Sequence, residues 1–473
     1  MNSSFQDTII APATIPGTGA ISIIRVSGPE VFSIVDSIIQ IKGGNCSSFN
    51  GFTIHYGTVL NADGLFLDEV LVSVFKRPRS YTGEDSVEIS CHASSFIVSE
   101  ILSLLSSAGA RMAKPGEFTE RAFLNGKMDL AQAEAVADVI SSNTSSSHRI
   151  ASNQLRGGFS SELSELRSQL LEMASLLELE LDFSEEDVEF ADRRKLLTLL
   201  HICSEHINKL KASFKVGNAI KNGVPVAIVG PVNAGKSTLL NAILGEERAI
   251  VSELAGTTRD TVEEAINIDG ILFRFIDTAG LRETNETVEK IGIARSFKKI
   301  SEAEIIIAVL DATNSEFDLL NNLRTVIDAI DFQRQNLVIC LNKSDICDNS
   351  SVNKNVMHIN NFVLHTGKKC KLLTISAKEK IGLSQITDYL VDHFKDLNID
   401  EHSTFITSQR HLDALSRAGE SLDRVQFSLS SPTPSDLVAE DLRLALAAIG
   451  EITGEITTPE ILNNIFSKHC IGK

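Results

Sequence analysis

A phosphate-binding loop is the clearest chemical feature of this chain. Residues 230–237 read Gly-Pro-Val-Asn-Ala-Gly-Lys-Ser, which fits the pattern G-x-x-x-x-G-K-S/T. An apolar run at 226–229 precedes the loop and a helical run at 238–244 follows it, so we expect strand, loop and helix in that order. The glycines let backbone N–H groups turn toward phosphate oxygens, Lys236 can reach the β- and γ-phosphates, and the Ser237 hydroxyl can bind Mg²⁺. A chance glycine-rich turn would lack these flanking elements.

Four further motifs follow in the order that a guanine-nucleotide-binding protein requires. They are Gly256–Asp260 (Gly-Thr-Thr-Arg-Asp), Asp277–Gly280 (Asp-Thr-Ala-Gly), Asn342–Asp345 (Asn-Lys-Ser-Asp) and Ser376–Lys378 (Ser-Ala-Lys). The last three come directly after apolar runs at 271–276, 336–341 and 372–375, which predict strands. Because the carboxyl ends of parallel strands meet at one edge of a sheet, we expect the motifs to converge on one nucleotide.

Each motif has a chemical role that suits GTP. Asp277 can hold the Mg²⁺ shell, Gly280 can offer its N–H to the γ-phosphate, and Thr258 is the candidate second hydroxyl ligand of Mg²⁺. Asp345 can accept two hydrogen bonds from guanine. Adenine cannot supply that pair, so the carboxylate would be left unsatisfied and ATP rejected. The segment 376–378 would cover the base.

Two residues depart from the usual switching GTPase. Leu281 stands directly after Asp-Thr-Ala-Gly, where a Ras-like protein has a glutamine that orients the attacking water. Another residue must therefore position the water, and Glu289 lies a short way along the same segment. Asn233 in the phosphate loop could hold a monovalent cation against the phosphates, which would neutralise charge as an arginine finger does.

The composition is that of a globular intracellular protein. Of 473 residues, 22% are charged and 43% are hydrophobic, so roughly two to four domains are expected. The net charge of −18 argues against broad, charge-driven binding of nucleic acid but is compatible with a local basic patch. Seven scattered cysteines without metal-ligand spacing indicate reduced thiols and a cytoplasmic protein. The sequence shows no secretory signal and no apolar run of membrane-spanning length.

The pattern of apolar residues divides the chain into four stretches. Residues 1–120 predict an α+β domain with strands at 21–26, 70–75 and 86–90. Residues 121–218 predict helices, one at 130–140 with Asp129 as its N-cap and another at 161–181. Residues 219–385 alternate strands and helices around the nucleotide motifs, and residues 386–473 return to helical patterning, notably at 436–449.

The nucleotide domain, 219–385, is best interpreted as an insertion. The helical stretches on its two sides would pack together as one discontinuous domain. An acidic run at 178–189 could be a metal or effector site, but charge runs are usually solvated helix ends, and we assign it no function.

The whole chain resembles the MnmE (TrmE) family of tRNA-modification GTPases. The resemblance rests on strings spread along its length: Thr82–Asp85, Lys114–Asn125, Lys127–Ala135, Asp277–Arg282 and the C-terminal signature Cys470–Lys473. It implies a multidomain α/β and α protein with an N-terminal α+β domain that binds folate and dimerises. The split all-helical domain would carry an inserted Ras-like P-loop G domain with a mainly parallel sheet.

The resemblance also implies a reaction and its partners. With an FAD-dependent partner, MnmG (GidA), in a heterotetramer or larger complex, a homodimer of the chain would add a carboxymethylaminomethyl-type group at C5 of the wobble uridine of certain tRNAs. The one-carbon donor would be 5-formyl- or 5,10-methylene-tetrahydrofolate. GTP hydrolysis would use Mg²⁺ and be activated by K⁺ as two G domains meet.

The nucleotide motifs and the resemblance together give a set of site residues. The predicted GTP site consists of Asn233, Ala234, Gly235, Lys236, Ser237, Thr238, Ser252, Thr257, Thr258, Asp277, Thr278, Ala279, Gly280, Asn342, Lys343, Asp345, Ser376, Ala377 and Lys378. By resemblance, Mg²⁺ falls on Ser237 and Thr258, and the water-orienting glutamate on Glu289. The K⁺ ligands fall on Asn233, the backbone of Ser252 and Leu254, and Thr257. Without the resemblance, Glu289 would be interpreted as a surface carboxylate.

The folate contacts fall, by resemblance, on Arg25, Glu88, Lys127 and Lys473. The simpler alternatives are that Arg25 only pairs with a carboxylate and that Lys127 is a solvated lysine before a helix. Cys470 is a candidate catalytic nucleophile toward uridine C6, with a thiol pKa lowered by Lys473 or His469. Its simpler alternative is a thiol that packs the tail.

Two other functional classes stay open at this point. A regulatory GTPase in ribosome assembly would be expected to carry a basic RNA-binding module, which the acidic balance does not show. A free-standing folate-dependent aminomethyl transferase would need neither tRNA nor an FAD protein. Folate binding separates the first alternative from the tRNA-modification interpretation, and dependence on tRNA separates the second.

Overall fold

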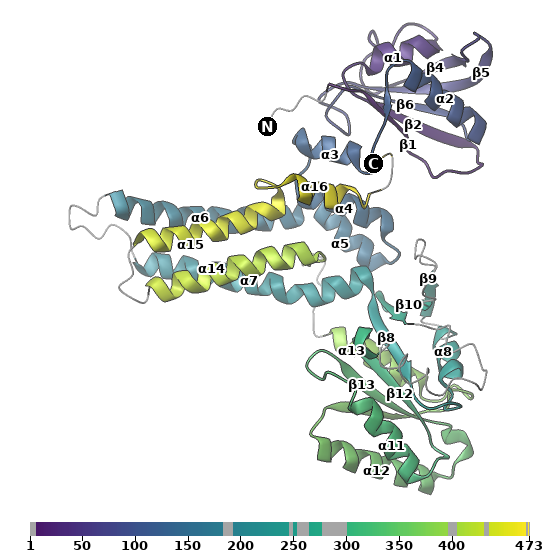
Figure 1. The fold of residues 1–473 in the computed structure, drawn as a ribbon, viewed down its shortest axis with the longest axis vertical. Coiled ribbons are helices and arrows are strands. Elements are labelled where there is room, and N and C mark those ends of the chain that lie inside the picture. Colours follow the sequence, from purple (N-terminus) through teal and green to yellow (C-terminus); the bar gives the residue numbers. More distant parts are fainter. Residues whose placement is uncertain are drawn as a thin grey trace. The chain divides into compact units, whose positions relative to one another are not determined.

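The computed structural model describes residues 6–182, 193–245, 249–252, 264–276, 300–395, 404–429, 435–469 and 472 (Figure 1). The chain forms two compact units. The first comprises Met1–Ser141, Ala151–Asn208 and Arg410–Lys473, and the second comprises Ser142–Ile150 and Lys209–Gln409. Each unit therefore joins segments that are far apart in the sequence.

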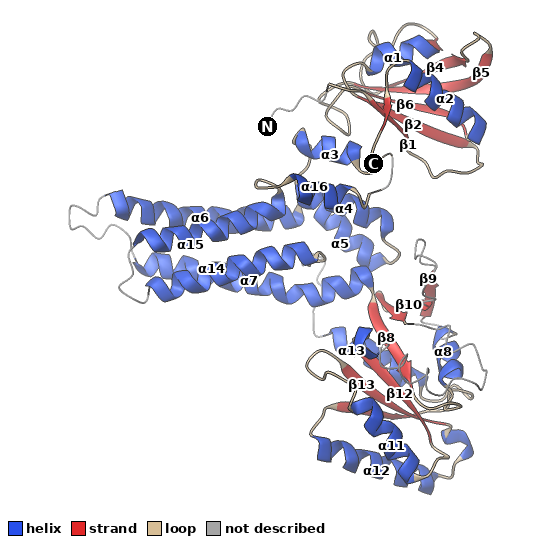
Figure 2. Ribbon diagram, viewed as in Figure 1, coloured by secondary structure: helices blue, strands red, loops and turns tan. Residues whose placement is uncertain are grey.

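A 7-stranded sheet opens the first unit (Figure 2). In spatial order its strands are β3 (Ile39–Ile41), β4 (Thr53–Leu60), β5 (Phe66–Phe75), β6 (Ser86–His92), β2 (Ile21–Ser27), β1 (Ile9–Pro12) and β7 (Arg111–Met112). Neighbouring strands are antiparallel, except that β1 and β7 are parallel. Buried residues alternate with more exposed ones along β2 and β5, so one face of the sheet is buried and the other is partly exposed.

The buried face of this sheet packs against two helices, α1 (Val31–Ile38) and α2 (Ser95–Ser107), in one apolar core. The opposite face carries exposed apolar side chains on β4 and β5. Tyr56 and Leu71, which are 42% and 48% exposed, are directly opposite each other across the two strands. The same face therefore combines apolar groups with the outward positions of β2 and β6.

Helices make up the rest of the first unit. They are α3 (Glu117–Leu124), α4 (Leu130–Ser141), the C-terminal part of α5 (Ser145–Leu155), α6 (Gly158–Asp182), the first half of α7 (Arg193–Asn222), α14 (Gln409–Leu429), α15 (Ser435–Thr453) and α16 (Pro459–Phe466). Helix α6 packs along α15, and ion pairs join α6 to α7 and α14 to α15 (Figure 1). Helices from both sides of the nucleotide segment thus form one bundle, which confirms the discontinuous helical domain.

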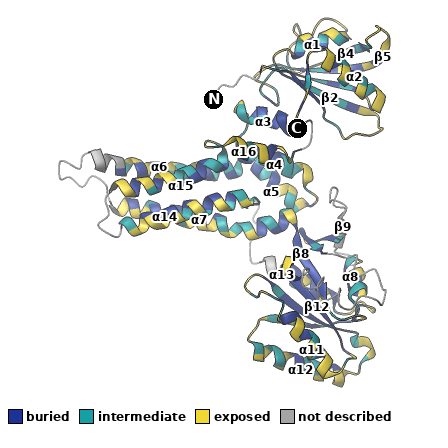
Figure 3. Ribbon diagram, in the orientation of Figure 1, coloured by how far each residue is buried: buried dark blue, intermediate teal, exposed yellow. Residues whose placement is uncertain are grey.

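The second unit contains a 7-stranded sheet of mainly parallel strands. In spatial order these are β14 (Cys370–Thr374), β13 (Asn336–Asn342), β12 (Ile305–Asp311), β8 (Val224–Val229), β11 (Ile271–Phe275), β10 (Glu264–Ile268) and β9 (Ala249–Ser252). The five strands from β14 to β11 are parallel, and β10 and β9 are antiparallel additions. Every residue of β12 is buried, as a strand covered on both faces requires (Figure 3).

Helices cover both faces of this sheet, and an apolar core lies between the helices and the sheet on each face. Helices α8 (Lys236–Leu244) and α13 (Leu383–Lys395) share one core with it, and α11 (Glu316–Ile327) and α12 (Asn349–Thr366) share the other. A 3-10 turn, η2 (Ser344–Ile346), follows β13. This is a doubly wound α/β domain, as the alternating pattern predicted.

The predicted elements recur with small shifts in their ends. Asp129 begins α4 as expected: its Oδ1 accepts a hydrogen bond from the Gln132 N–H at 2.8 Å, and Gln132 Oε1 accepts one from the Asp129 N–H. The expected boundary at 385/386 falls inside α13, whose Ile386 and Leu390 pack on the nucleotide-domain sheet, so that domain continues through α13. None of the helices in the described parts of the chain combines the length and apolar character that a membrane span needs.

Gly116 provides a stability test for the first unit. It begins α3 at φ +70, and a Cβ there would lie 2.5 Å from the Phe466 carbonyl oxygen, at the end of α16. Gly126 has φ +69 with nothing within 4 Å of the same position. We expect Gly116→Ala to lower the free energy of unfolding by about 1–3 kcal/mol more than Gly126→Ala in urea titrations. Equal losses would show that only backbone strain matters at Gly116.

Candidate functional site

The phosphate loop connects β8 to α8, and its two glycines permit close contacts with neighbouring strands. Gly230 has φ +146, and a Cβ there would lie 2.2 Å from the Val309 carbonyl oxygen on β12. Gly235 has φ +98, and its Cβ would lie 2.2 Å from Asn342 Nδ2. Larger residues at either position would push the loop off the sheet edge, so both glycines are structural requirements.

The loop arranges hydrogen-bond donors around its centre. Lys236 Nζ donates to the carbonyl oxygens of Gly230 and Pro231 at 2.9 and 2.7 Å, which holds the ammonium group across the loop. Gly235 is the N-cap of α8 and has no side chain that could accept a hydrogen bond. The N–H groups of Ser237 and Thr238, in the first turn of the helix, therefore receive no side-chain cap from it. A helix N-terminus with such N–H groups beside an ammonium group suits a phosphate. Asn233 is exposed, with φ +63.

Asn342 joins the phosphate loop to the base-binding loop. Its side chain is nearly inaccessible, at 2% exposure. Nδ2 donates to the Ala234 carbonyl oxygen at 2.8 Å, and Oδ1 accepts a hydrogen bond from the Ala377 N–H at 2.9 Å. The first residue of the Asn-Lys-Ser-Asp motif therefore fixes two other motifs relative to each other rather than facing a ligand. The sequence alone did not reveal this role.

The other base-side residues are held by short contacts. Ser376 Oγ donates to Asp345 Oδ1 at 2.6 Å, which orients an exposed carboxylate. Lys343 Nζ pairs with Asp311 Oδ2 at 2.6 Å. Burial would raise the pKa of Asp311, but hydrogen bonds from Lys343 and Thr313 outweigh it and hold that pKa below its ordinary value. Lys378 is exposed beside Ser376. The ionised Asp311 holds the Lys343 side chain in place.

Several predicted residues cannot be placed. Outside the described residues lie Leu254, Thr257, Thr258, Asp277, Thr278, Ala279, Gly280, Glu289, Cys470 and Lys473, together with most of the acidic run. Ser252 ends β9, which pairs with β10. The structure thus brings together the phosphate-loop, Asn-Lys-Ser-Asp and Ser-Ala-Lys motifs. Among the described residues, no cluster of three or more histidine, cysteine or acidic side chains has the geometry of a metal site.

A second group of predicted residues meets on the open face of the N-terminal sheet. Arg25 on β2 is directly opposite Glu88 on β6. The guanidinium Nε and Nη2 donate to Glu88 Oε1 at 3.0 and 2.8 Å. The two side chains are 13% and 26% exposed, so the pair is partly desolvated. The ion pair that the simpler alternative expected is therefore present.

Aromatic rings and the end of the chain lie around this pair. The guanidinium carbon of Arg25 is 5.0 Å from the ring centroid of Tyr81 and 5.7 Å from that of Phe118. Arg25 Nη1 donates to the Gly472 carbonyl oxygen at 3.2 Å. A Cβ on Gly472 would lie 2.3 Å from the Pro12 carbonyl oxygen, so this position requires glycine. The C-terminal signature thus reaches the predicted folate residues within one chain.

Lys127 makes a different contact from the other predicted folate residues. Its Nζ donates to the Pro78 carbonyl oxygen at 3.0 Å. Sequence reasoning missed Tyr81 and Phe118, although both lie beside or within the strings that carry the family resemblance. It also missed Arg121, which is fully buried. The carboxylates that surround Arg121 are Asp7, Glu84 and Glu117.

His469 is buried beside Phe466 at the start of the tail. Burial lowers the pKa of its ring, and the fields of Asp138 and Glu134 only partly oppose this. The ring is therefore neutral near pH 7. A neutral ring can act on the Cys470 thiol only by accepting its proton, and activation of Cys470 by His469 or Lys473 stays a prediction.

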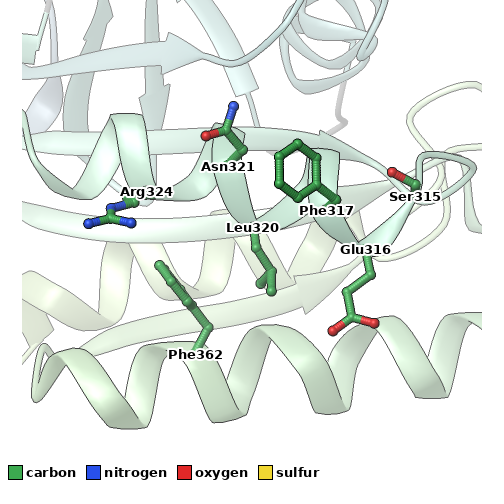
Figure 4. A pocket seen from close by; sticks show the side chains of 7 residues that line it. All are labelled: Ser315, Glu316, Phe317, Leu320, Asn321, Arg324 and Phe362. Carbon is green, nitrogen blue, oxygen red and sulfur yellow. The ribbon is translucent and has the colours of Figure 1, made fainter.

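A pocket of about 540 Å³ lies elsewhere in the second unit, between α11 and α12 (Figure 4). Its lining consists of Ser315, Glu316, Phe317, Leu320, Asn321, Arg324 and Phe362. None of the predicted site residues lines it. The two candidate centres are therefore the nucleotide motifs and the Arg25 cluster. This cluster consists of Arg25, Glu88, Tyr81, Phe118 and Gly472.

Two family models match this chain. A family model described as the MnmE helical domain matches residues 130–470, and one described as the GTP-binding protein TrmE N-terminus matches residues 8–127. Together these matches extend over almost the whole chain.

Full-length relatives carry the same description, tRNA modification GTPase MnmE. The protein of Flavobacterium johnsoniae is 49% identical over 474 residues and aligns over 99% of both chains. That of Bacteroides thetaiotaomicron is 47% identical over 99% of this chain and 100% of its own. That of Cytophaga hutchinsonii is 47% identical over 100% of this chain and 99% of its own. The chain therefore belongs to the MnmE family of tRNA modification GTPases.

Proposed function

We propose that this chain uses GTP hydrolysis to drive the modification of the wobble uridine in certain tRNAs. With the FAD-dependent partner MnmG it adds a carboxymethylaminomethyl-type group at C5 of that base, in the cytoplasm, with a reduced folate as the one-carbon donor. The relatives are named for tRNA modification, and the nucleotide motifs supply the GTPase. The observation that carries the proposal is the meeting of the C-terminal tail with the Arg25 cluster.

The Arg25 cluster has the chemistry that a folate needs. A pterin ring presents an amino group and a ring N–H that match a carboxylate, and its flat faces suit aromatic neighbours. Glu88 is such a carboxylate, oriented by Arg25, and Tyr81 and Phe118 are the aromatic neighbours. Burial raises the pKa of Tyr81, so its hydroxyl stays protonated while it bonds Thr119 Oγ1 at 2.9 Å. When bound, the folate supplies the one-carbon unit.

The tail gives the cluster its chemical role. Gly472 accepts a hydrogen bond from Arg25, and Cys470 precedes it by two residues in the sequence, which supports a role of Cys470 at the folate site. A thiolate there would be close enough to act on a uridine that receives the one-carbon unit. Lys473 follows Gly472 directly and would contribute to the same site.

In the G domain, the residues divide into phosphate, base and cation functions. Lys236 and the N-terminus of α8 bind the phosphates, Asp345 selects guanine, and Ser376, Ala377 and Lys378 cover the base. Ser237 with Thr258 binds Mg²⁺, Asn233 and Thr257 bind K⁺, and Glu289 orients the water. Asn233 lies exposed in the loop, where its side-chain oxygen can reach a cation beside the phosphates.

The open face of the N-terminal sheet supports a homodimer. Ile54, Tyr56 and Leu71 expose 67%, 42% and 48% of their surface next to one another on β4 and β5. A second copy would cover this apolar face and enclose the folate clusters of both chains.

The guanine selection is testable at Asp345. Asp345→Asn replaces an acceptor by a donor opposite the guanine N–H groups, so we expect GTP affinity to fall by at least about a hundredfold. Xanthosine triphosphate, whose ring offers a carbonyl instead of an amine, should bind better to this variant than GTP does. Titrations with fluorescent nucleotides measure both. Glu379→Gln, an exposed neighbouring carboxylate, is the matched control and should not alter affinity. Unchanged GTP affinity in Asp345→Asn would contradict the assignment.

The cation function is testable by salt substitution. We expect GTP hydrolysis to be faster in K⁺ than in Na⁺ by about tenfold or more, because a cation at the phosphates stabilises the transition-state charge and the smaller Na⁺ fits the ligands poorly. Asn233→Ala should abolish the difference, whereas Val232→Ala, 81% exposed on the same loop, should keep it. Equal rates in the two salts for the unaltered protein would exclude the potassium site.

The folate site is testable by calorimetry with 5-formyl-tetrahydrofolate. Arg25→Ala leaves Glu88 and the tail without their shared partner, so we expect affinity to drop roughly ten- to a hundredfold. Lys42→Ala, an exposed cation at the end of β3, is the control for lost charge on the same sheet. Thermal melting separates misfolding from lost binding. Folded wild-type protein that gives no heat with the folate would refute the folate role.

A further inference from the structure

A short basic turn lies near the Arg25 cluster in the N-terminal domain. Lys76–Arg79 reads Lys-Arg-Pro-Arg and connects β5 to β6. The Arg79 N–H donates to the Lys76 carbonyl oxygen at 2.9 Å, which closes a β-turn. Arg77 and Arg79 are both exposed. The turn therefore presents two guanidinium groups at the surface on a fixed backbone.

Lys127 adds a third cation to this turn. Its ammonium group donates to the Pro78 carbonyl oxygen, between the two arginines in the sequence. Nearby, Asn125 Nδ2 donates to the Thr82 carbonyl oxygen at 2.8 Å, and a Cβ on Gly83 would lie 3.3 Å from the Lys127 stem, so the two loop segments lie close together. Lys127 thus contacts the turn from the segment after α3, and the Asn125 hydrogen bond fixes that segment to the loop between β5 and β6.

The nearby carboxylates leave this charge largely uncompensated. Asp85 accepts a hydrogen bond from the Arg77 backbone N–H at 2.9 Å, at the base of the turn. Glu84 is directed inward, where it accepts from Ser27 Oγ at 2.8 Å and pairs with Arg121. Lys76 turns aside, with its Nζ on the Ser47 carbonyl oxygen. Three cations therefore share one surface in a chain whose net charge is −18.

We propose that Arg77 and Arg79 of the basic turn, together with Lys127, bind phosphates of the tRNA whose uridine is modified. This inference rests on the proposed function and names the surface that receives the substrate. An acidic chain repels RNA overall, so binding needs a local set of cations, and arginine forks match phosphate oxygens. Tyr81, two residues beyond Arg79, lies on the Arg25 guanidinium, so the basic turn borders the folate cluster.

The glutamate tail of a folate is the competing source of negative charge. The three exposed cations are Arg77 and Arg79 on the turn and Lys127 beside it. They suit a series of backbone phosphates better than the one or two carboxylates of a small ligand. The observations therefore favour RNA.

The test is binding of an unmodified, fluorescently labelled tRNA transcript to the full-length chain with its FAD partner, over a range of salt concentrations. For Arg77→Gln/Arg79→Gln we expect an affinity loss of about tenfold or more and a plot of log K against log salt that is shallower by roughly one to two. Lys368→Gln/Lys369→Gln, an exposed pair that follows α12, makes the same charge change and should leave both quantities unaltered. Thermal melting checks that both variants are folded.

The possible failures are distinguishable. If the unaltered complex binds no tRNA, the proposed function fails and this inference fails with it. If the unaltered complex binds and Arg77→Gln/Arg79→Gln binds equally well, the basic turn is not the surface. An equal loss in the Lys368/Lys369 variant would mean that only total charge matters. If the arginine variant keeps tRNA but loses polyglutamylated folate, the turn holds the folate tail and the RNA assignment is wrong.

Discussion

The buried amide of Asn342 is the constraint on which the nucleotide centre depends. With one hydrogen bond to the phosphate loop and one to the Ser-Ala-Lys loop, it sets the distance between the place of the phosphates and the place of the base. Both bonds are shielded from water, so neither loop can shift without leaving a buried polar group unpaired. Gly235 is required because its Cβ would occupy the position of this amide. The guanine selection proposed for Asp345 would depend on this fixed distance between the two loops.

The N-terminal centre depends on a different kind of constraint, a set of buried charges. Arg121 is fully inaccessible to solvent. Its ion pairs connect Asp7, near the N-terminus, to Glu117 on α3 and to Glu84 in the loop at 82–85. Removing Arg121 would leave its carboxylate partners without the buried cation that compensates them, at a cost of about 3–5 kcal/mol. The same loop carries Tyr81 onto Arg25, which in turn holds the tail through Gly472. Structural charges around Arg121 thus support the loop that precedes the groups proposed to bind folate.

The sequence predicted the architecture and the nucleotide motifs because their signals are local. Apolar runs, glycines and Asp129 with Gln132 each act within a few residues of themselves, and their elements recur in the structure. The structural role of Asn342, the aromatic neighbours of Arg25 and the network of Arg121 depend on contacts across 35 to 114 positions, which periodicity does not report. The neutral His469 was missed for a related reason: its pKa follows from burial, which the adjacent Cys470 does not reveal. The end of the G domain was placed too early because α13 looks like any amphipathic helix.

The most direct test of the account is nucleoside analysis of bulk tRNA from cells that lack this protein. The account predicts loss of the carboxymethylaminomethyl-type wobble uridine, with other modified nucleosides kept, and its return when the intact gene is restored. An unchanged nucleoside profile in the deleted cells would contradict the claim that the GTPase and the Arg25 cluster serve one tRNA-modifying reaction.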